Sequence, residues 1–202
     1  MGTSEAALVR RLREGDEAAF REVFDAHHAT LVRVASAFVK SPSIAEEIAQ
    51  DTWVAVLDAL GSFEERSRFK TWMVRIAINR AKTRAARDGR QVPLDDEPAP
   101  SVDPSRFGPL GTFKQLPARW DETPESLLAR GEVRAAIERC LEDLPPAQRA
   151  VVTLRDLEGW SSEEVCNALD LSESNQRVLL HRGRGRLRDA LDAVLAERKP
   201  PR

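Results

Sequence analysis

The sequence predicts an all-α protein made of two small helical domains joined by a long irregular linker. The chain of 202 residues is 42% hydrophobic and 32% charged, and it is rich in Ala, Leu, Arg and Glu, which favour helices. Valine and isoleucine rarely fall into the alternating pattern of a strand. A proline-rich stretch separates two segments of helical periodicity. We therefore expect residues 1–90 and 125–202 to form the domains and residues 91–124 to form the linker.

Apolar residues at helical spacing define four helices in the amino-terminal domain. The second is expected to stop near Pro42, because the residue before a proline disfavours helical backbone. The fourth has apolar and basic residues on opposite faces, which turns its charges towards solvent. The four helices are expected around Leu8–Leu12, Phe20–Phe38, Ile44–Leu60 and Arg68–Arg87.

The linker is unusually long and not purely polar. Residues 88–124 contain seven prolines and three glycines, which leave no room for a regular element. A passive tether needs no large apolar side chains, so we expect those present to dock on a partner or on the flanking domains. They are Phe107, Leu110, Phe113, Leu116 and Trp120.

The carboxy-terminal domain is expected to contain a helix-turn-helix. After helices around residues 127–141 and 147–157, Ser161 and Glu164 have the spacing of a capping box. A short helix to Leu169, a tight turn and a long helix follow. The second helix of such a motif enters the major groove of DNA. Its candidate base and phosphate contacts are Asn175, Gln176, Arg177, His181, Arg182 and Arg184.

The net charge of −2 conceals a strong partition of charge along the chain. Residues 66–90 carry nine basic side chains against Asp88 alone, and residues 177–188 carry five arginines and no carboxylate. Residues 44–65 are acidic with no basic residue. Solvated helix faces usually mix both signs, whereas single-sign blocks favour binding surfaces. We interpret the partition as two DNA contacts and one protein contact.

Two sets of motifs resemble one known family. LPPAQR at 144–149, LEGWS at 157–161 and LHRGR at 180–184 are similar to the region-4 domain of extracytoplasmic-function sigma factors. AEEIAQDTW at 45–53 resembles the core-polymerase-binding helix of the same family, and FKTWMVRIAIN at 69–79 resembles its minus-ten-reading helix. The resemblance covers both domains in the family's order. It implies a sigma factor that directs core polymerase to promoters and starts their melting.

The resemblance also implies protein partners. Glu47, Gln50 and Asp51 should face the clamp coiled coil of the largest subunit of RNA polymerase, and the polymerase flap is a second expected contact. The linker should follow the RNA path of the polymerase. Members of this family are usually held inactive by an anti-sigma factor, so such an inhibitor is a third expected partner.

Promoter DNA is the remaining implied partner. Phe63 and Ser67 should cradle a base turned out of the stack at the minus-ten element, and Arg177 with its neighbours should read the minus-thirty-five element. Further contacts to the minus-ten element and its phosphates are expected from Arg75, Asn79, Arg80 and Lys82.

The chain departs from the family pattern in two places. Phe63 is followed by Glu64 and Glu65, where the family often has Arg-Gly, which leaves the recognised base open. Gly183 and Gly185 interrupt the recognition helix, and each costs about 1 kcal/mol relative to alanine. We expect them either to allow close approach to a phosphate or to keep the helix marginal until DNA binds.

Other classes of protein find little support. Cys140 and Cys166 lie far apart without a CxxC pattern, which excludes a zinc module or disulfide framework and fits thiols in a reducing cytosol. His27 and His28 lack a second ligand at metal spacing. No catalytic grouping can be named, so we expect no enzyme, cofactor or metal site. Without a signal peptide or an apolar stretch of membrane length, the expected location is cytoplasmic.

Two alternatives remain open from the residues alone. A helix-turn-helix repressor or activator acting by itself would bind DNA tightly without polymerase, but it gives no role to the acidic helix. An enzyme or metal-dependent sensor is the weaker alternative.

Overall fold

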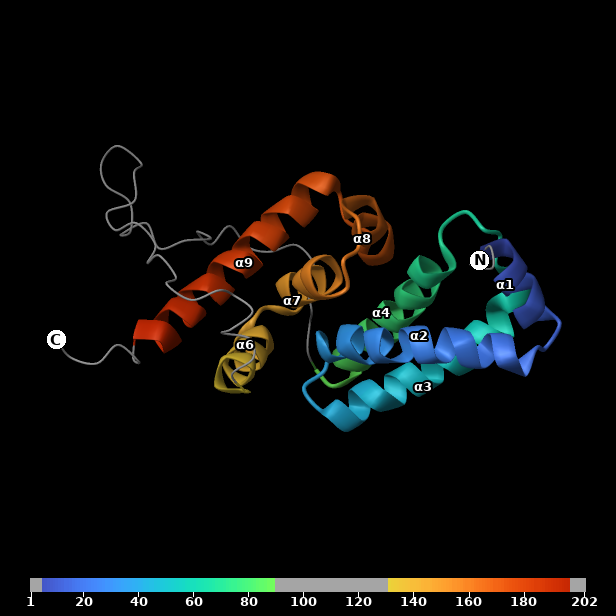
Figure 1. The fold of residues 1–202 in the computed structure, drawn as a ribbon, viewed down its shortest axis with the longest axis horizontal. Coiled ribbons are helices and arrows are strands. Elements are labelled where there is room, and N and C mark those ends of the chain that lie inside the picture. Colours follow the sequence, from blue (N-terminus) through green and yellow to red (C-terminus); the bar gives the residue numbers. More distant parts are fainter. Residues whose placement is uncertain (1–4, 90–130, 197–202) are drawn as a thin grey trace.

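The computed structural model describes residues 5–89 and 131–196, and within these ranges the chain forms helices and no strand (Figure 1). The amino-terminal half contains α1 (Glu5–Arg13), α2 (Glu17–Ser36), α3 (Pro42–Ala59), the 3-10 turn η1 (Leu60–Ser62) and α4 (Phe69–Arg87). The carboxy-terminal half contains α6 (Gly131–Asp143), α7 (Pro146–Val152), the π-helical turn η3 (Thr153–Leu157), α8 (Ser162–Leu169) and α9 (Glu173–Ala196).

The all-α prediction is confirmed for these residues. The predicted linker and its five apolar side chains lie outside the described residues. Within the described part, no helix is both long and apolar enough to cross a membrane.

Side chains and a proline fix where the first helices begin. The Oδ1 atom of Asp16 accepts hydrogen bonds from the backbone N–H groups of Ala18 (2.9 Å) and Ala19 (3.1 Å), which caps α2. The Arg11 guanidinium donates to the same carboxylate at 2.7 Å and is the main cause that lowers the pKa of Asp16. Pro42 is the first residue of α3, a position where its missing N–H costs nothing.

The end of α2 differs from the prediction. The helix ends at Ser36, about five residues before the expected stop. The following residues Ala37, Phe38 and Val39 are nevertheless buried. The pattern of apolar residues therefore extends beyond the end of α2, because the segment that connects α2 to α3 is also buried in the core.

An aromatic cluster joins α2 to α3. The rings of Phe20 and Phe24 lie 5.7 and 5.2 Å from that of Trp53. His28 stacks on Phe24 at 4.6 Å and accepts a hydrogen bond at Nδ1 from Trp53 Nε1 at 3.2 Å. Its Nε2 contacts Glu46 at 2.9 Å. Because both ring nitrogens have partners, His28 is a packed residue and not an exposed one.

The helix-turn-helix of the carboxy-terminal half is confirmed, with its predicted capping box. The Ser161 hydroxyl accepts from the Glu164 N–H at 3.2 Å, and the Glu164 carboxylate accepts from the Ser161 N–H at 2.9 Å. Asp170 turns the chain in the left-handed region, with φ of 59°. Ser172 then accepts from the Asn175 N–H at 3.2 Å and starts α9.

Gly183 serves packing, which corrects the prediction that it approaches a phosphate or weakens the helix. It is buried where α9 crosses α7. A Cβ atom at this position would lie 2.6 Å from Cγ2 of Val152 and 3.6 Å from Cβ of Gln148. Glycine therefore allows a close approach of two helices inside the domain, on the side of α9 that faces away from solvent.

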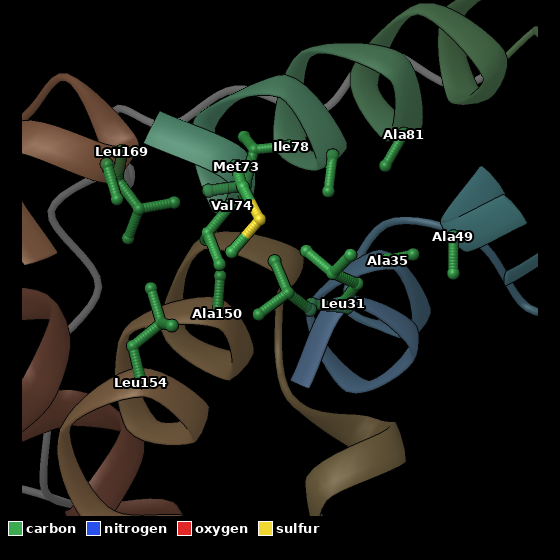
Figure 2. Close-up of a cluster of buried hydrophobic side chains, with 14 of the residues drawn as sticks. Leu31, Ala35, Ala49, Met73, Val74, Ile78, Ala81, Ala150, Leu154 and Leu169 are labelled. Carbon is green, nitrogen blue, oxygen red and sulfur yellow. The ribbon is translucent and has the colours of Figure 1, made fainter. Parts of the chain in front are cut away.

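The two halves share one hydrophobic core. Helix α4 packs against α8, and α2 contacts η3. Figure 2 shows apolar side chains from both halves gathered in a single cluster. The cluster includes Leu31, Met73, Val74, Ile78, Ala150, Leu154 and Leu169.

Substitution of Gly183 tests this contact. We expect Gly183→Ala to lower the free energy of unfolding, because overpacking costs about 1–3 kcal/mol and outweighs the ~1 kcal/mol that alanine gains in a helix. In a Val152→Ala background, where the clashing methyl is gone, the same substitution should raise stability. Urea denaturation of the four proteins measures both effects. The same sign in both backgrounds would show that close packing is not what requires glycine.

Candidate nucleic-acid and protein interfaces

The three residues predicted to bind polymerase all lie exposed on α3. Glu47, Gln50 and Asp51 point away from the core. Val54 and Leu57 continue this side of the helix, at the fourth and seventh residues after Gln50, and their side chains remain 59% and 49% exposed. We call these five residues the α3 face. It combines carboxylates with exposed apolar groups, a composition suited to contact with another protein.

Carboxylates of the α3 face already contact basic residues of α4. Glu47 Oε1 lies 3.4 Å from Arg84 Nη1, and Asp51 Oδ2 lies 3.7 Å from Arg80 Nη1. These side chains are between 35% and 60% exposed, and such pairs at the surface contribute only about 0–1 kcal/mol. The acidic and basic blocks of the sequence therefore meet where α3 packs against α4. A binding partner can break either ion pair with only a small loss of free energy.

The predicted minus-ten residues of α4 separate into three environments. Arg75 and Asn79, one turn apart, are exposed to solvent. Arg80 leans towards Asp51 on α3. Lys82 is half-buried, and this burial lowers its pKa, against the attraction of Asp170 in the turn before α9. Arg75, Asn79 and Arg80 are therefore accessible from solvent, whereas Lys82 is only partly so.

The loop before α4 packs on a cluster of aromatic side chains. Phe63 is buried, with its ring 5.3 Å from Phe69 and 4.9 Å from Trp72. Ser67 is half-exposed in the same loop. Phe63 was expected to cradle a flipped base, but in this structure its ring lies beneath the loop and supports it.

Helix α1 anchors this loop at both ends, which sequence reasoning missed. Arg13 donates to the carbonyl oxygens of Leu60 (3.3 Å) and Phe63 (2.5 Å). The Glu5 carboxylate accepts from the Phe69 N–H at 2.7 Å, and so satisfies an unpaired donor at the start of α4. These partners lie 47 to 64 residues apart along the chain, so no local pattern could reveal them.

The recognition helix α9 presents the predicted basic stripe. Arg177, His181 and Arg184 are exposed on one side. Arg177 Nη2 contacts Glu173 at 2.9 Å. Arg184 makes two hydrogen bonds to Asp156, of 2.9 and 2.5 Å, and these raise the pKa of the guanidinium. The charges are held in place by neighbours but remain accessible.

The other predicted residues of α9 are less exposed. Asn175 and Arg182 are half-buried. Gln176 is buried, and its Oε1 accepts from the Ser162 hydroxyl at 2.8 Å, which ties α8 to α9. Gln176 therefore does not reach the exposed side of the helix, contrary to the expectation. The buried stripe of α9 could have indicated this, because it runs at helical spacing through Gln176, Leu179, Leu180 and Gly183.

The described residues hold no group of His, Cys, Asp and Glu side chains that could bind a metal ion. Cys140 and Cys166 are free thiols, and burial raises the pKa of each. Neither thiol belongs to the surfaces described above.

Comparison with known proteins connects these surfaces to a family. Residues 23–91 match the model of Sigma-70 region 2, and residues 134–187 match Sigma-70, region 4. The chain is 30% identical over 181 residues to the ECF RNA polymerase sigma-E factor of Escherichia coli (strain K12), a match that covers 90% of this chain and 91% of the relative. It is also 30% identical over 190 residues to the RNA polymerase sigma-H factor of Pseudomonas aeruginosa, covering 94% and 95%.

Solved structures show the same fold. The structure of CnrH in complex with the cytosolic domain of CnrY matches with a TM-score of 0.61 at 21% identity, covering 98% of this chain and 100% of that one. The sigma factor RpoE of Bartonella quintana, in complex with the anti-sigma factor NepR, matches with a TM-score of 0.58 at 20% identity, covering 85% and 96%. The chain belongs to the extracytoplasmic-function group of the sigma-70 family, whose members direct core RNA polymerase to promoters.

Proposed function

We propose that this sigma factor divides promoter recognition among three surfaces. The α3 face binds core polymerase, the exposed part of α4 with the preceding loop reads the minus-ten element, and the stripe on α9 reads the minus-thirty-five element. One observation carries this assignment: each of these helices is buried on one side and exposes a chemically distinct set of side chains on the other. The corresponding domains are residues 1–90 and 125–202.

The α9 stripe has the chemistry of major-groove readout. An arginine can donate two hydrogen bonds to the O6 and N7 atoms of guanine, and Arg177 lies near the start of α9, where the recognition helix reaches base edges. His181 and Arg184 follow along the helix and suit phosphate contacts. Their partners Glu173 and Asp156 do not prevent this, because exposed ion pairs are weak enough for phosphates to replace.

The α4 surface suits a strand whose bases are exposed by melting. The Asn79 amide can both donate to and accept from a base edge, and Arg75 can hold a neighbouring phosphate. A base that leaves the stack needs a preformed pocket, because unstacking costs a few kcal/mol. The loop that α1 anchors supplies this rigidity. We assign base contact to Ser67 and the support of the loop to Phe63.

The remaining assignments concern where and with what the protein works. We propose that it acts in the cytoplasm beside core polymerase and catalyses no reaction itself. The solved structures of CnrH and RpoE are complexes with CnrY and with the anti-sigma factor NepR. By analogy, we propose that an anti-sigma factor also binds this chain. The decisive experiment adds the purified protein to core polymerase and a genomic promoter library. Specific transcripts support the proposal, and their complete absence refutes it.

Removal of charge from the α3 face should weaken the polymerase contact. Glu47→Gln with Asp51→Asn is expected to lower affinity for core polymerase about ten-fold, because two charged contacts are lost without introducing repulsion beside Arg80 and Arg84. Binding is measured by competition against a labelled sigma factor. Asp25→Asn on the exposed side of α2 is the matched control and should bind normally. Equal affinities for all three proteins would exclude the α3 face as the contact.

Arg177 should contact a specific base of the minus-thirty-five element, and not only a phosphate. Arg177→Ala is expected to relax preference at one position of the minus-thirty-five element, with a loss of about 1–3 kcal/mol at that position. Selection of binding sites from a randomised promoter, with wild type and variant in complex with core polymerase, measures this. A uniform loss over all sequences would make Arg177 a phosphate contact.

Loss of the α1 anchor should impair melting more than binding. Arg13→Met removes two hydrogen bonds to the loop and is expected to slow promoter opening about ten-fold, equivalent to about 1.4 kcal/mol. Permanganate reactivity of unpaired thymines measures opening, and the affinity for core polymerase should be unchanged. Arg10→Met, an exposed position on the same helix, is the control. Normal opening by the Arg13 variant would contradict the anchoring role.

A further inference from the structure

The recognition helix α9 carries a large apolar side chain on its exposed side. Val178 follows Arg177 near the beginning of α9 and is 44% exposed. Among the described residues, the other exposed large hydrophobic side chains are Val54, Leu57 and Leu157, and none of these lies on α9. The first two belong to the α3 face. Val178 is therefore an isolated apolar group on a surface whose other exposed residues are polar or basic.

Helical geometry places Val178 near the middle of the exposed side of α9. The side that faces the core is defined by the buried residues of the helix, which among the described side chains are Gln176, Leu179, Leu180 and Gly183. Because successive residues point about 100° apart, the direction opposite to these four passes within about 30° of Val178. The same direction is about 70° from Arg177 and about 90° from Arg184. The valine thus points away from the domain more directly than either arginine.

The neighbours of Val178 show what kind of surface this is. His181 and Ser174 are exposed beside it, and Arg177 and Arg184 are exposed along one flank. Long basic side chains on the flank of a recognition helix can reach phosphates and base edges from the side. A short side chain in the middle lets the helix axis approach the base pairs closely. When α9 enters the major groove, Val178 therefore meets the edges of the bases.

Base chemistry determines which partner an apolar side chain can have in the major groove. All four bases present hydrogen-bond donors or acceptors there, but only thymine adds an apolar group, its C5-methyl. The valine side chain can neither donate nor accept, so covering a polar base edge with it costs free energy. Contact with the C5-methyl instead removes apolar surface from water, and the burial of one methyl group contributes a factor of about four in affinity.

The choice of valine at this position is informative. A β-branched side chain has one strongly preferred rotamer in a helix, so the two methyl groups of Val178 are oriented before DNA binds, and binding restricts them little. Valine is also a weaker helix former than alanine, lysine or glutamate, which an exposed position that served stability alone would favour. Isolated exposed apolar residues are common on protein surfaces, but the middle of a basic recognition surface gives this one a specific partner.

We propose that Val178 selects a thymine in the minus-thirty-five element by contact with its C5-methyl group. The thymine lies within about two base pairs of the position that Arg177 contacts, because adjacent residues are only about 1.5 Å apart along a helix. The inference rests on the proposed function, since it requires α9 to bind the minus-thirty-five element. It adds the identity of one base that α9 selects.

Removal of a single methyl group from the DNA tests this contact. Deoxyuridine lacks only the C5-methyl of thymidine and keeps its hydrogen-bonding pattern. In the element selected by the wild-type protein, each thymine on either strand is replaced in turn, and the affinity of the complex with core polymerase for the promoter is measured. One replacement near the Arg177 position should lower affinity about four-fold. An element without a thymine there, or affinities that no replacement changes, would overturn the proposal.

The variant Val178→Ala should lose the preference for the methyl group. It removes both γ-methyl groups, so it should bind the thymine and deoxyuridine promoters equally, at about the affinity of wild type for deoxyuridine. Alanine favours helix, so thermal unfolding should show no loss of stability. The matched control is Leu157→Ala, at a 53% exposed apolar position outside α9, which should keep the full preference. A Val178→Ala protein that still prefers thymine would contradict the contact.

Two further comparisons separate an apolar contact from other effects. The slope of affinity against salt concentration reflects the number of phosphates contacted, so Val178→Ala should leave it unchanged. A smaller slope would show that the substitution shifts α9 on the DNA backbone, and it would refute a direct contact. If the wild-type complex binds no promoter at all, the proposed function fails together with this inference. If it binds promoters but is indifferent to the methyl group, only the role of Val178 fails.

Discussion

The burial of α4 on three sides is the constraint on which the rest of this structure depends. The helix packs against α2, α3 and α8. Three of its alanines, Ala77, Ala81 and Ala85, are fully buried one turn apart, and such small side chains let neighbouring helices approach closely. Because so much of the circumference is occupied, one edge stays open, and it carries Arg75, Asn79, Arg80, Thr83, Ala86 and Arg87. The same packing sets the α3 face on one flank of α4 and the helix-turn-helix on the other.

Features with local causes were predictable from the sequence. The capping box of Ser161 and Glu164, the turn at Asp170 and the spans of α3, α4 and α8 follow from short motifs and helical periodicity, and the structure confirms them. The early end of α2 was not predictable, because the apolar residues after Ser36 are buried whether or not they are helical. The spacing of apolar residues indicates which side chains are buried, but a buried segment need not be helical.

The candidate site was predictable in outline but not in its buried details. Exposed residues such as Arg177, Asn79 and Glu47 followed from charge and from the family motifs. Phe63 and Gln176 were misplaced because their surroundings come from residues on other helices. Arg13 could not be found at all, since the carbonyl oxygen of Phe63 that it contacts lies 50 residues away. Long-range polar contacts of this kind leave no periodic signal in a single sequence.

The close contact at Gly183 has a consequence for how α9 reads DNA. With no side chain at this position, α9 rests against Val152 at one fixed rotation about its own axis. Successive residues of a helix point about 100° apart, so a rotation of that size would replace Arg177 by its neighbour at the base edges. The absence of a side chain at Gly183 thus determines which side chains of α9 face the DNA. Promoter preference can then change through single exposed side chains, while the geometry of docking on DNA stays the same.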